Sequence, residues 1–511
     1  MSEKRLDEHL RTSVRLHPDH IAYHFDGRDV SYQELGEQVE HAAGYLSAQG
    51  AVKGQGLAIL LPNSDAFVIL YEAALRLGMY VVPMNPLYTP EELQYMLMDS
   101  DVQWIAGARP LMQFAPLLQA KVPGINLIAV GDGEEPLAAG VVDYRDIMSS
   151  TWPEAKLPGA VSEDDTAVIL YTSGTTGKPK GAMLTHRNLC TNAEIIGDYL
   201  NYSGTDRVLA VLPMFHVFCL SVCLHASIYR GAQVVILPRF SPSEVLRVIE
   251  EKRITIFLGV PTMYNFLLRT AGEQKVDTRS LRLCISGGAA MPVALMEAFE
   301  KHFAVRILEG YGLSEASPVT AFAPVDGRER KSGSIGVTLP GLEQRVVDDQ
   351  DEELPVGEVG ELVVRGPSVM KGYWRRPEET AATLRGGWLH TGDLARMDED
   401  GYFYIVDRKK DMIIVGGFNV YPREIEELLY AHPGIAEAAV IGMPDEAYGE
   451  QVVACVVVRD ANLTEESVKA YCEAHLVKYK RPAQVRFFEE LPKNQTGKVL
   501  HRALRERIQA V

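Results

Sequence analysis

Tyr171-Thr-Ser-Gly-Thr-Thr-Gly-Lys-Pro-Lys-Gly181 is the stretch around which the fold and the site are organised. It follows the apolar run Ala167-Val-Ile-Leu170 and precedes a helix-like segment that begins at Thr185. The order strand, glycine-rich loop and helix leaves backbone N–H groups, hydroxyls and lysines free to surround phosphate oxygens. The pattern therefore predicts a loop that binds the phosphates of a nucleotide.

This loop is not a P-loop of the Walker type, which has four residues between its glycines and then Gly-Lys-Ser/Thr. Here two threonines separate Gly174 from Gly177, and Pro179 follows Lys178. Clusters of glycine, serine and threonine are often simple solvated turns. Because three glycines, three threonines, one serine and two lysines fall within eleven residues, phosphate binding is the favoured interpretation.

The chain of 511 residues is too long for one hydrophobic core, and its length predicts roughly two to four domains. Its content of 47% hydrophobic and 23% charged residues is typical of a soluble globular protein. A formal net charge of −17 argues against non-specific binding to nucleic acid or to anionic membranes. A polyanionic ligand would therefore have to be held by local lysines, arginines and backbone N–H groups.

The N-terminal sequence lacks the apolar core of a signal peptide, which argues against export. Six cysteines are too few for a disulfide framework and fit a reducing cytoplasm. The long uncharged run between Arg207 and Arg230 is interrupted by Pro213, His216 and Ser221, so it indicates buried core or pocket lining rather than a membrane span. We therefore expect a cytoplasmic protein without a transmembrane segment.

Residues 1–160 alternate helix-like and strand-like segments. Helical spacing of apolar residues covers Tyr32–Leu46 and Ala66–Leu77, and short apolar runs cover Gly56–Leu61 and Tyr80–Pro83. This alternation predicts βαβ units and a mostly parallel sheet. Further buried strands are predicted after the loop, over residues 206–213, 233–238, 254–259 and 281–286.

Several side chains that could bind a ligand or a metal ion follow predicted strands. In open α/β sheets, ligands bind beyond the carboxyl ends of the strands. Tyr311, close to the end of one strand, suits stacking on a base, and Glu315 suits holding Mg²⁺ against phosphates. For His216, flanked by aromatic residues, two interpretations stay open: it lines a pocket for an apolar acid, or it is a satisfied core histidine.

The residue pattern changes at about Lys331, where short segments of alternating apolar and polar residues are broken by glycine and proline. This pattern predicts a small antiparallel β subdomain over about 331–406. Residues 407–410, Asp-Arg-Lys-Lys, are charged without apolar periodicity and predict a linker. The remaining residues, 411–511, are numerous enough to fold as a unit.

Six stretches then occur in a fixed order: Tyr171–Gly181, Tyr311–Glu315, Trp388–Leu394, Asp407–Ile413, Gly416–Glu426 and Pro492–Lys498. Together they resemble the adenylate-forming superfamily of acyl-CoA synthetases, adenylation domains of peptide synthetases and firefly-type luciferases. The resemblance covers essentially the whole chain.

The resemblance implies a reaction in two steps. A carboxylate and MgATP give acyl-AMP and pyrophosphate, and a thiol then attacks the acyl-AMP. The first step requires neutralisation of charge on the transferring and leaving oxygens, which loops, Mg²⁺ and a lysine supply. The second step needs no such lysine, because AMP is already a good leaving group. ATP, Mg²⁺ and CoA are the expected cofactors and co-substrate.

The implied fold class is α/β with several subdomains (α+β), as in luciferase and the acyl-CoA synthetases. Residues 1–406 would form a large N-terminal AMP-binding domain of mixed and parallel sheets with helices, including the β subdomain. Residues 407–410 would form a hinge, and residues 411–511 a small mobile C-terminal α+β domain. Rotation about Lys410 would replace Lys498 by the Gly416–Gly417 loop between the two steps.

The resemblance also assigns roles at the phosphate end of the site. The loop residues that would embrace the β- and γ-phosphates are Thr172, Ser173, Gly174, Thr175, Thr176, Gly177 and Lys178. Glu315, with Thr172, would bind Mg²⁺, and Ser314 stands where the family more often has threonine. Lys498 would bridge the carboxylate and the α-phosphate. The implied catalytic residues are Lys498, Glu315, His216 and Thr172.

At the nucleoside end, Tyr311 and the backbone of Gly287–Ala289 would hold adenine. Asp393 would accept hydrogen bonds from the ribose hydroxyls, helped by Arg408. The other implied nucleotide and cofactor contacts are Gly287, Gly288, Ala289, Glu309, Gly310, Gly312, Ser314, Lys410, Gly416 and Gly417.

Within the superfamily, four stretches look most like bacterial medium- or long-chain fatty acid–CoA ligases: Pro213–Phe218, Val260–Tyr264, Ser286–Ala289 and Gly312–Pro318. His216 then becomes an acid-pocket or gate residue. Residues 212–218 lack the aspartate with which peptide-synthetase domains bind an amino group. The alternatives are an acyl-AMP ligase that loads a carrier protein in trans, and a non-catalytic nucleotide-binding scaffold. The sequence leaves the oligomeric state open, with a homodimer as one alternative.

Overall fold

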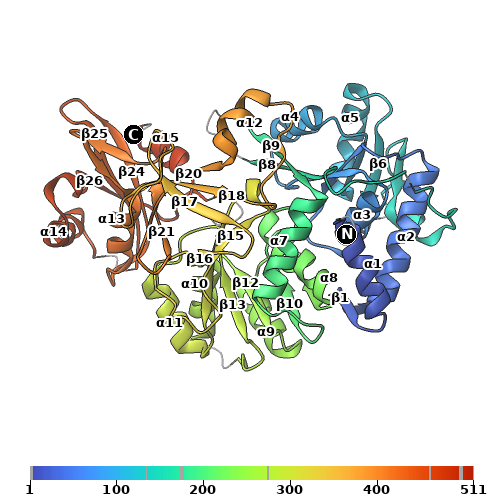
Figure 1. Cartoon of the computed structure of the whole chain (residues 1–511), viewed down its shortest axis with the longest axis horizontal. Helices are drawn as coiled ribbons and strands as arrows, with labels where there is room; N and C mark the ends of the chain where they lie inside the picture. The colour runs from blue at the N-terminus through green and yellow to red at the C-terminus, as the bar shows by residue number, and fades with distance from the viewer. Residues whose placement is uncertain are drawn as a thin grey trace.

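The computed structural model describes residues 4–133, 135–157, 159–172, 178–272, 276–459, 462–493 and 499–509. These residues form a mixed α/β protein with a large N-terminal domain of several sheets and a small, β-rich C-terminal domain (Figure 1). The predicted fold class is therefore confirmed. In Figure 1 the C-terminal domain, in orange and red, lies at one end of the long axis, and the N-terminal segments, in blue, lie at the other.

One sheet of the large domain has eight strands in the order β19-β9-β8-β4-β3-β5-β6-β7. Its strands are β3 (Gly56–Leu60), β4 (Tyr80–Pro83), β5 (Trp104–Ala108), β6 (Asn126–Val130), β7 (Val141–Asp143), β8 (Thr166–Thr172), β9 (Lys180–Thr185) and β19 (Gly372–Tyr373). From β8 to β7 all neighbours are parallel, as the alternating pattern predicts. The associated helices are α2 (Tyr32–Ala48), α3 (Asp65–Arg76), α4 (Pro90–Ser100), α5 (Ala115–Lys121) and α6 (Tyr144–Ser149).

Strand β9 corrects the expectation that the glycine-rich loop runs directly into a helix. Residues Lys180–Thr185 pair antiparallel with β8, and helix α7 (His186–Tyr199) begins only after them. The glycine-rich stretch is therefore followed by a strand that pairs with β8, and not by a helix. The apolar side chains of Ala182 and Leu184 are buried in the core, which favours the strand.

The second large sheet has nine strands in the order β16-β15-β14-β13-β12-β10-β11-β1-β2. They are β1 (Ile21–Phe25), β2 (Arg28–Ser31), β10 (Arg207–Ala210), β11 (Gln233–Ile236), β12 (Ile256–Gly259), β13 (Leu283–Ser286), β14 (Ile307–Gly312), β15 (Val319–Phe322) and β16 (Val337–Thr338). Neighbours from β1 to β14 are parallel, so β12, β13 and β14 end at one edge. The helices include α1 (Leu6–Leu16), α8 (Ala226–Arg230), α9 (Pro242–Glu251), α10 (Pro261–Ala271) and α11 (Val293–Phe303).

The uncharged run between Arg207 and Arg230 forms β10, a π-helix over Cys219–His225, and α8. Every residue of the π-helix is buried, as expected for core. Across the described residues, no helix is both long and apolar enough to cross a bilayer. The six cysteines are free and buried, in keeping with a role as small apolar side chains.

The segment after Lys331 forms a four-stranded antiparallel sheet, β17-β18-β20-β21. Its strands are β17 (Glu343–Val347), β18 (Gly360–Arg365), β20 (Leu389–Met397) and β21 (Phe403–Arg408), and helix α12 spans Pro377–Thr383. The same segment also contributes β16 and β19 to the two larger sheets, so it joins them as well as forming its own layer.

The C-terminal domain is built on a long antiparallel hairpin, β24 (Ile435–Asp445) and β25 (Gly449–Val458), with β26 (Gln484–Phe487) parallel to β25. The other elements are β22 (Ile413–Val415), β23 (Phe418–Val420), α13 (Pro422–Tyr430), α14 (Glu465–His475) and α15 (His501–Gln509). The apolar faces of β22, α13 and the hairpin share a core that includes Ile413, Ile425 and Val440.

Candidate active site

The nucleoside end of the candidate site lies where β14 meets the four-stranded sheet. The hydroxyl of Tyr311 donates to Oδ2 of Asp393, and Nε of Arg408 lies 3.5 Å from Oδ1 of the same carboxylate. Asp393 and Arg408 are paired across β20 and β21. Burial, with the charge of Asp393, raises the pKa of Tyr311 well above its ordinary value, so the phenol stays protonated and donates. The structure thus brings together three residues that the sequence assigns to the nucleoside.

The turn that carries Asp393 is fixed by the preceding threonine. Thr391 Oγ1 donates to the carbonyl of Leu362 at 2.7 Å and accepts from the N–H of Asp393 at 3.1 Å. Gly392, between them, has φ +72°, a conformation that glycine adopts without strain. The carboxylate of Asp393 is therefore held on a defined turn rather than on a free loop.

The turn after β13 lies against the end of β14. A Cβ at Gly287 would lie 3.1 Å from the ring of Phe218 and 3.4 Å from the carbonyl oxygen of Gly310. Gly287 is buried, whereas Gly288 and Ala289 are exposed. This geometry leaves the backbone of the turn open to a flat ligand, as the sequence predicts for adenine.

Glu309, on β14 behind this turn, is almost fully buried and accepts a hydrogen bond from the N–H of Met291 at 3.2 Å. Burial raises the pKa of Glu309 to about 7, and the positive charge of Arg423 in the C-terminal domain opposes that rise. The charge of a residue in the C-terminal domain therefore acts on this carboxyl.

The phosphate end is organised around Glu315, which lies in the short turn Ser314–Ala316. Oε1 of Glu315 accepts from the hydroxyl of Thr172 at 3.3 Å and from the hydroxyl of Tyr373 at 2.9 Å. The Glu315 carbonyl accepts from the N–H of Met370 at 2.8 Å. In the described part of the chain no hydrogen bond reaches Oε2 of this carboxylate. Two segments distant in sequence, one with Thr172 and the other with Tyr373, thus converge on one acidic group.

Two lysines flank the phosphate end. The Nζ of Lys178 lies 5.6 Å from the centre of the Tyr95 ring, and the Nζ of Lys180 lies 5.4 Å from that of Tyr373. The ring that Lys180 faces is that of Tyr373, whose hydroxyl donates to Glu315. The other predicted loop residues, Ser173, Gly174, Thr175, Thr176 and Gly177, lie outside the described residues, as does Lys498.

His216 lies between β10 and the π-helix and is half-buried. Its Nδ1 accepts from the N–H of Phe218 at 3.3 Å. Because the Phe218 ring contacts the Gly287 turn, His216 lies two residues from a side chain that borders the nucleoside end.

The predicted hinge and the Gly416–Gly417 turn belong to the junction with the C-terminal domain. Lys410 is exposed immediately after β21, and Gly416 and Gly417, with φ +56° and +85°, form the turn between β22 and β23. None of the contacts given by the described residues connects this turn to Asp393 or Glu315. The turn is flanked by exposed aromatic rings, Phe418 and Tyr448.

Some side chains at the site were not predicted from the sequence. Tyr373 comes from a two-residue strand, and Arg423 comes from the first turn of α13. The N–H of Arg423 donates to Oδ2 of Asp407 at 3.0 Å, and its Nη1 donates to the carbonyl of Ile405 at 2.8 Å. No local sequence pattern predicts the role of either residue, because its partners lie in other elements. Arg423 alone lies within a stretch, Gly416–Glu426, that the sequence had marked.

A large domain of mixed sheets joined to a small β-rich domain is the architecture of the adenylate-forming enzymes. The chain belongs to the AMP-binding enzyme family, whose model matches residues 10–374, while the model of the AMP-binding enzyme C-terminal domain matches residues 424–498. It is an AMP-forming acid–thiol ligase.

Relatives with curated names agree with this class. The chain is 39% identical to a long-chain-fatty-acid–CoA ligase of Bacillus subtilis, over 99% of this chain and 95% of the relative. It is 36% identical to a feruloyl-CoA synthase of an Amycolatopsis species, over 97% of both chains. Among solved structures, ATP-bound MatB from Rhodopseudomonas palustris matches with a TM-score of 0.90 and 34% identity over 99% of both chains. The apo form of MatB matches with a TM-score of 0.80 at 35% identity, also over 99% of both chains.

Proposed function

We propose that this protein is an ATP-dependent fatty acid–CoA ligase that activates a medium- or long-chain carboxylic acid as acyl-AMP and then transfers the acyl group to CoA. The convergence of Thr172 and Tyr373 on Glu315, beside the Tyr311–Asp393–Arg408 cluster, carries the proposal. In the proposed site, one carboxylate would serve the phosphate end of ATP and the other the nucleoside end. The curated relatives support the acid class.

At the nucleoside end, Asp393 would accept hydrogen bonds from the ribose hydroxyls, and Arg408 would help to orient the carboxylate. Tyr311 and the backbone of Gly287–Ala289 would bound the adenine. Because this end binds the AMP part of both ATP and acyl-AMP, its residues would serve both steps.

At the phosphate end, Thr172, Lys178 and the intervening loop would neutralise the leaving pyrophosphate. The carboxylate of Glu315 and the hydroxyl of Thr172 are hard oxygen ligands of the kind that Mg²⁺ prefers, and they fit this ion. The metal would neutralise charge on the phosphates. The Tyr373 hydroxyl holds one oxygen of Glu315, so the other is available to a metal ion.

We further propose that the two steps are separated by a movement of residues 411–511 about the hinge at 407–410, with residues 1–406 as the fixed domain. Lys498 would reach the carboxylate and the α-phosphate in the first step, and the Gly416–Gly417 turn would replace it in the second. The different TM-scores of ATP-bound and apo MatB, at the same coverage, support more than one domain arrangement in that relative. This chain has the higher score with the ATP-bound form.

The curated relatives include ligases named for a long-chain fatty acid and for ferulate, so the choice of acid is the part of the proposal to test first. We expect His216 to border the acid pocket. Pyrophosphate release should be measured with straight-chain acids of increasing length and with ferulate, with acyl-CoA identified by mass spectrometry. Activity that peaks on a medium- or long-chain acid and disappears on chelation of Mg²⁺ supports the proposal. Preference for ferulate, or no activity with any straight-chain acid, contradicts it.

Two alternatives are separated by the same assay. A ligase that loads a carrier protein would accumulate acyl-AMP in the presence of CoA and turn over only when a carrier is added. A non-catalytic scaffold would bind ATP without releasing pyrophosphate. Light scattering on the eluting protein would decide whether a homodimer forms.

A further inference from the structure

A buried carboxylate, that of Glu361 on β18, lies next to the candidate site without being part of it. Its side chain is 7% exposed. Oε1 accepts from the N–H of Gly392 at 3.1 Å, and Oε2 lies 3.4 Å from Nζ of Lys409. The same Oε2 lies 3.5 Å from Nδ1 of His390 and 3.6 Å from Nη2 of Arg385. Glu361 therefore has one backbone donor on one oxygen and three basic groups around the other.

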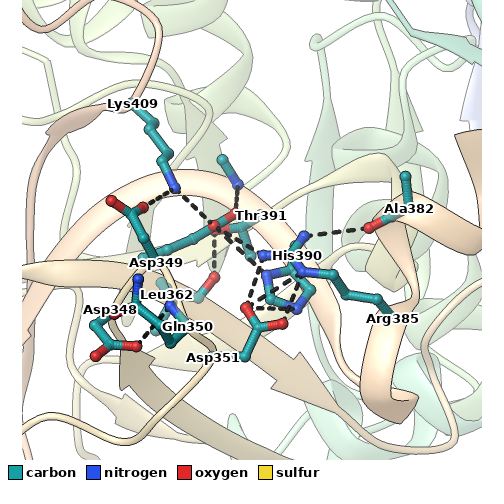
Figure 2. A network of polar contacts seen from close by, with 12 residues as sticks. Asp348, Asp349, Gln350, Asp351, Leu362, Ala382, Arg385, His390, Thr391 and Lys409 are labelled. Atoms are coloured by element: carbon teal, nitrogen blue, oxygen red, sulfur yellow. Dashed lines mark hydrogen bonds and ion pairs between the residues drawn. The ribbon is translucent and has the colours of Figure 1, made fainter.

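A second layer of acidic residues surrounds these basic groups. Lys409 donates to Asp349 at 2.8 Å, and Arg385 donates to Asp351 at 2.8 Å. Figure 2 shows Lys409 reaching down to Asp349, and His390 lying between Asp351 and Arg385. Asp349 and Asp351 are exposed at their side chains, 78% and 42% respectively, so water screens these outer pairs.

Two of the residues that Glu361 contacts, Gly392 and Lys409, are adjacent in sequence to residues of the candidate site. Gly392 immediately precedes Asp393, which we assign to the ribose. Lys409 immediately follows Arg408, and Lys410, the proposed hinge residue, comes next. The N–H of Lys409 also donates to the carbonyl of Gly392 at 2.9 Å. One carboxylate thus ties the turn that carries Asp393 to the strand end that carries Arg408 and leads into the hinge.

The buried contacts of Glu361 should contribute more free energy than the exposed ion pairs of Asp349 and Asp351. A buried carboxylate is stable as an ion only if surrounding charges and N–H groups compensate its desolvation, and removing part of the compensation is costly. The exposed pairs of Asp349 and Asp351 contribute little by comparison. The position of Lys409 and of the Gly392 turn should therefore depend on Glu361 much more than on the outer acids.

We infer that Glu361 is a positioning residue that sets the separation of Asp393 and Arg408 around the ribose and fixes Lys409 as the anchored end of the hinge. The inference rests on the proposed function for the roles of Asp393 and Lys410. Glu361 itself does not touch the nucleotide; it acts through the Gly392 turn and through Lys409.

The test compares Glu361→Gln with the matched control Asp349→Asn, which removes the exposed partner of the same lysine. Glutamine keeps the size of the side chain and an oxygen for the Gly392 N–H but removes the charge. AMP binding by the full-length protein is measured by calorimetry, and pyrophosphate release gives KM for ATP and kcat. We expect Glu361→Gln to raise the AMP dissociation constant and KM about tenfold, with kcat changed much less. Asp349→Asn should change each value by no more than about twofold.

Two variants of Lys409 provide the second part of the test. Lys409→Met should weaken AMP binding and alter the rate of adenylation relative to acyl transfer from synthetic acyl-AMP, whereas Lys409→Arg, which keeps the charge, should restore both. Thermal unfolding of each variant distinguishes positioning from loss of fold.

An unchanged AMP dissociation constant in Glu361→Gln, with lower thermal stability or lower kcat alone, would show a purely structural role and overturn the inference. So would equal effects of Glu361→Gln and Asp349→Asn. Failure of the proposed function is a separate result: wild-type protein would bind AMP yet activate no carboxylic acid, and the AMP-binding arm would still decide the role of Glu361.

Discussion

The nucleoside end of the site and the contact between the two domains are only a few residues apart in sequence, yet they are held in different ways. At the nucleoside end, side chains from two sheets bind one another directly, through Tyr311, Asp393 and Arg408. At the domain contact, Arg423 binds the carbonyl of Ile405 and offers its own N–H to Asp407. The first region is cross-linked between fixed strands. The second includes two hydrogen bonds from Arg423, at the start of α13, to the last residues of β21.

This difference matches the contacts that would stay the same in both steps and those that would change. Under the proposed function, AMP would be held in the same way in both half-reactions, so its contacts would belong to one rigid body. The groups that differ between the steps would be exchanged, so they would belong to the other body. The predictions below test this division, beginning with the largest expected effect.

Replacement of Lys498 by alanine should separate the half-reactions most strongly. Acyl-AMP formation should fall by about 10²–10³, because a charge that stabilises the transferring phosphate is lost. Transfer from synthetic acyl-AMP to CoA should remain close to wild type. Single-turnover measurement of each step checks this. Lys493→Ala is the matched control, since Lys493 is paired with Glu437 inside the C-terminal domain. Equal loss of both steps would contradict the exchange of groups.

Glu309→Gln should change how the free energy of unfolding of the protein depends on pH. The folded-state pKa of Glu309 is raised by burial to about 7 from an ordinary value of 4.5. The stability that protonated Glu309 contributes is therefore full below pH 4.5 and is lost as pH rises through about 7. Relative to the glutamine variant, the wild type should lose up to about 3 kcal/mol over this range.

Urea unfolding of both proteins at several pH values checks this prediction. Other buried carboxyls, such as Glu72 and Glu426, are common to the two proteins and cancel in the difference. Parallel pH profiles would mean that Glu309 does not titrate in the folded protein over this range.

Asp393→Ala should impair both half-reactions, in contrast to Lys498→Ala. We expect kcat/KM for ATP to fall by about 10², because a charged acceptor of two ribose hydrogen bonds is lost. Transfer from acyl-AMP should lose a comparable factor, since the same ribose is bound. Asp400→Asn, an exposed acid on the same sheet, provides the baseline. Loss confined to one step would place Asp393 outside the shared nucleoside end.

Arg423→Ala should have the smallest effect and act on the balance between steps. The hydrogen bond from Nη1 of Arg423 to the carbonyl of Ile405 on β21 is lost, while the backbone N–H still reaches Asp407, so adenylation should slow relative to acyl transfer by about threefold. Lys480→Ala, which removes an ion pair with Glu424 on the same helix, is the control. Stopped-flow rates of the two steps give the ratio. A ratio equal to that of wild type would mean that Arg423 does not favour the present arrangement.

Much of the fold could be predicted from local patterns. The strand Tyr80–Pro83 has the predicted bounds, because the short apolar run ends at a proline. Strand β9 could not be predicted in this way, since Lys180–Thr185 is short, contains Gly181 and takes its strand conformation from pairing with β8. The two-residue strand that carries Tyr373 offers even less local signal.

The sequence by itself determined the order of strands and helices, the α/β class and the chemical types at the site: a hydroxyl- and lysine-rich loop, Glu315, Tyr311 and Asp393. These follow from periodicity and side-chain chemistry, which are local. Only the tertiary structure decided that Thr172 meets Glu315 across 143 positions and that Tyr311 meets Asp393 across 82. Such pairings arise from the packing of whole sheets, whose free energy is shared among many residues and is not encoded at either partner alone.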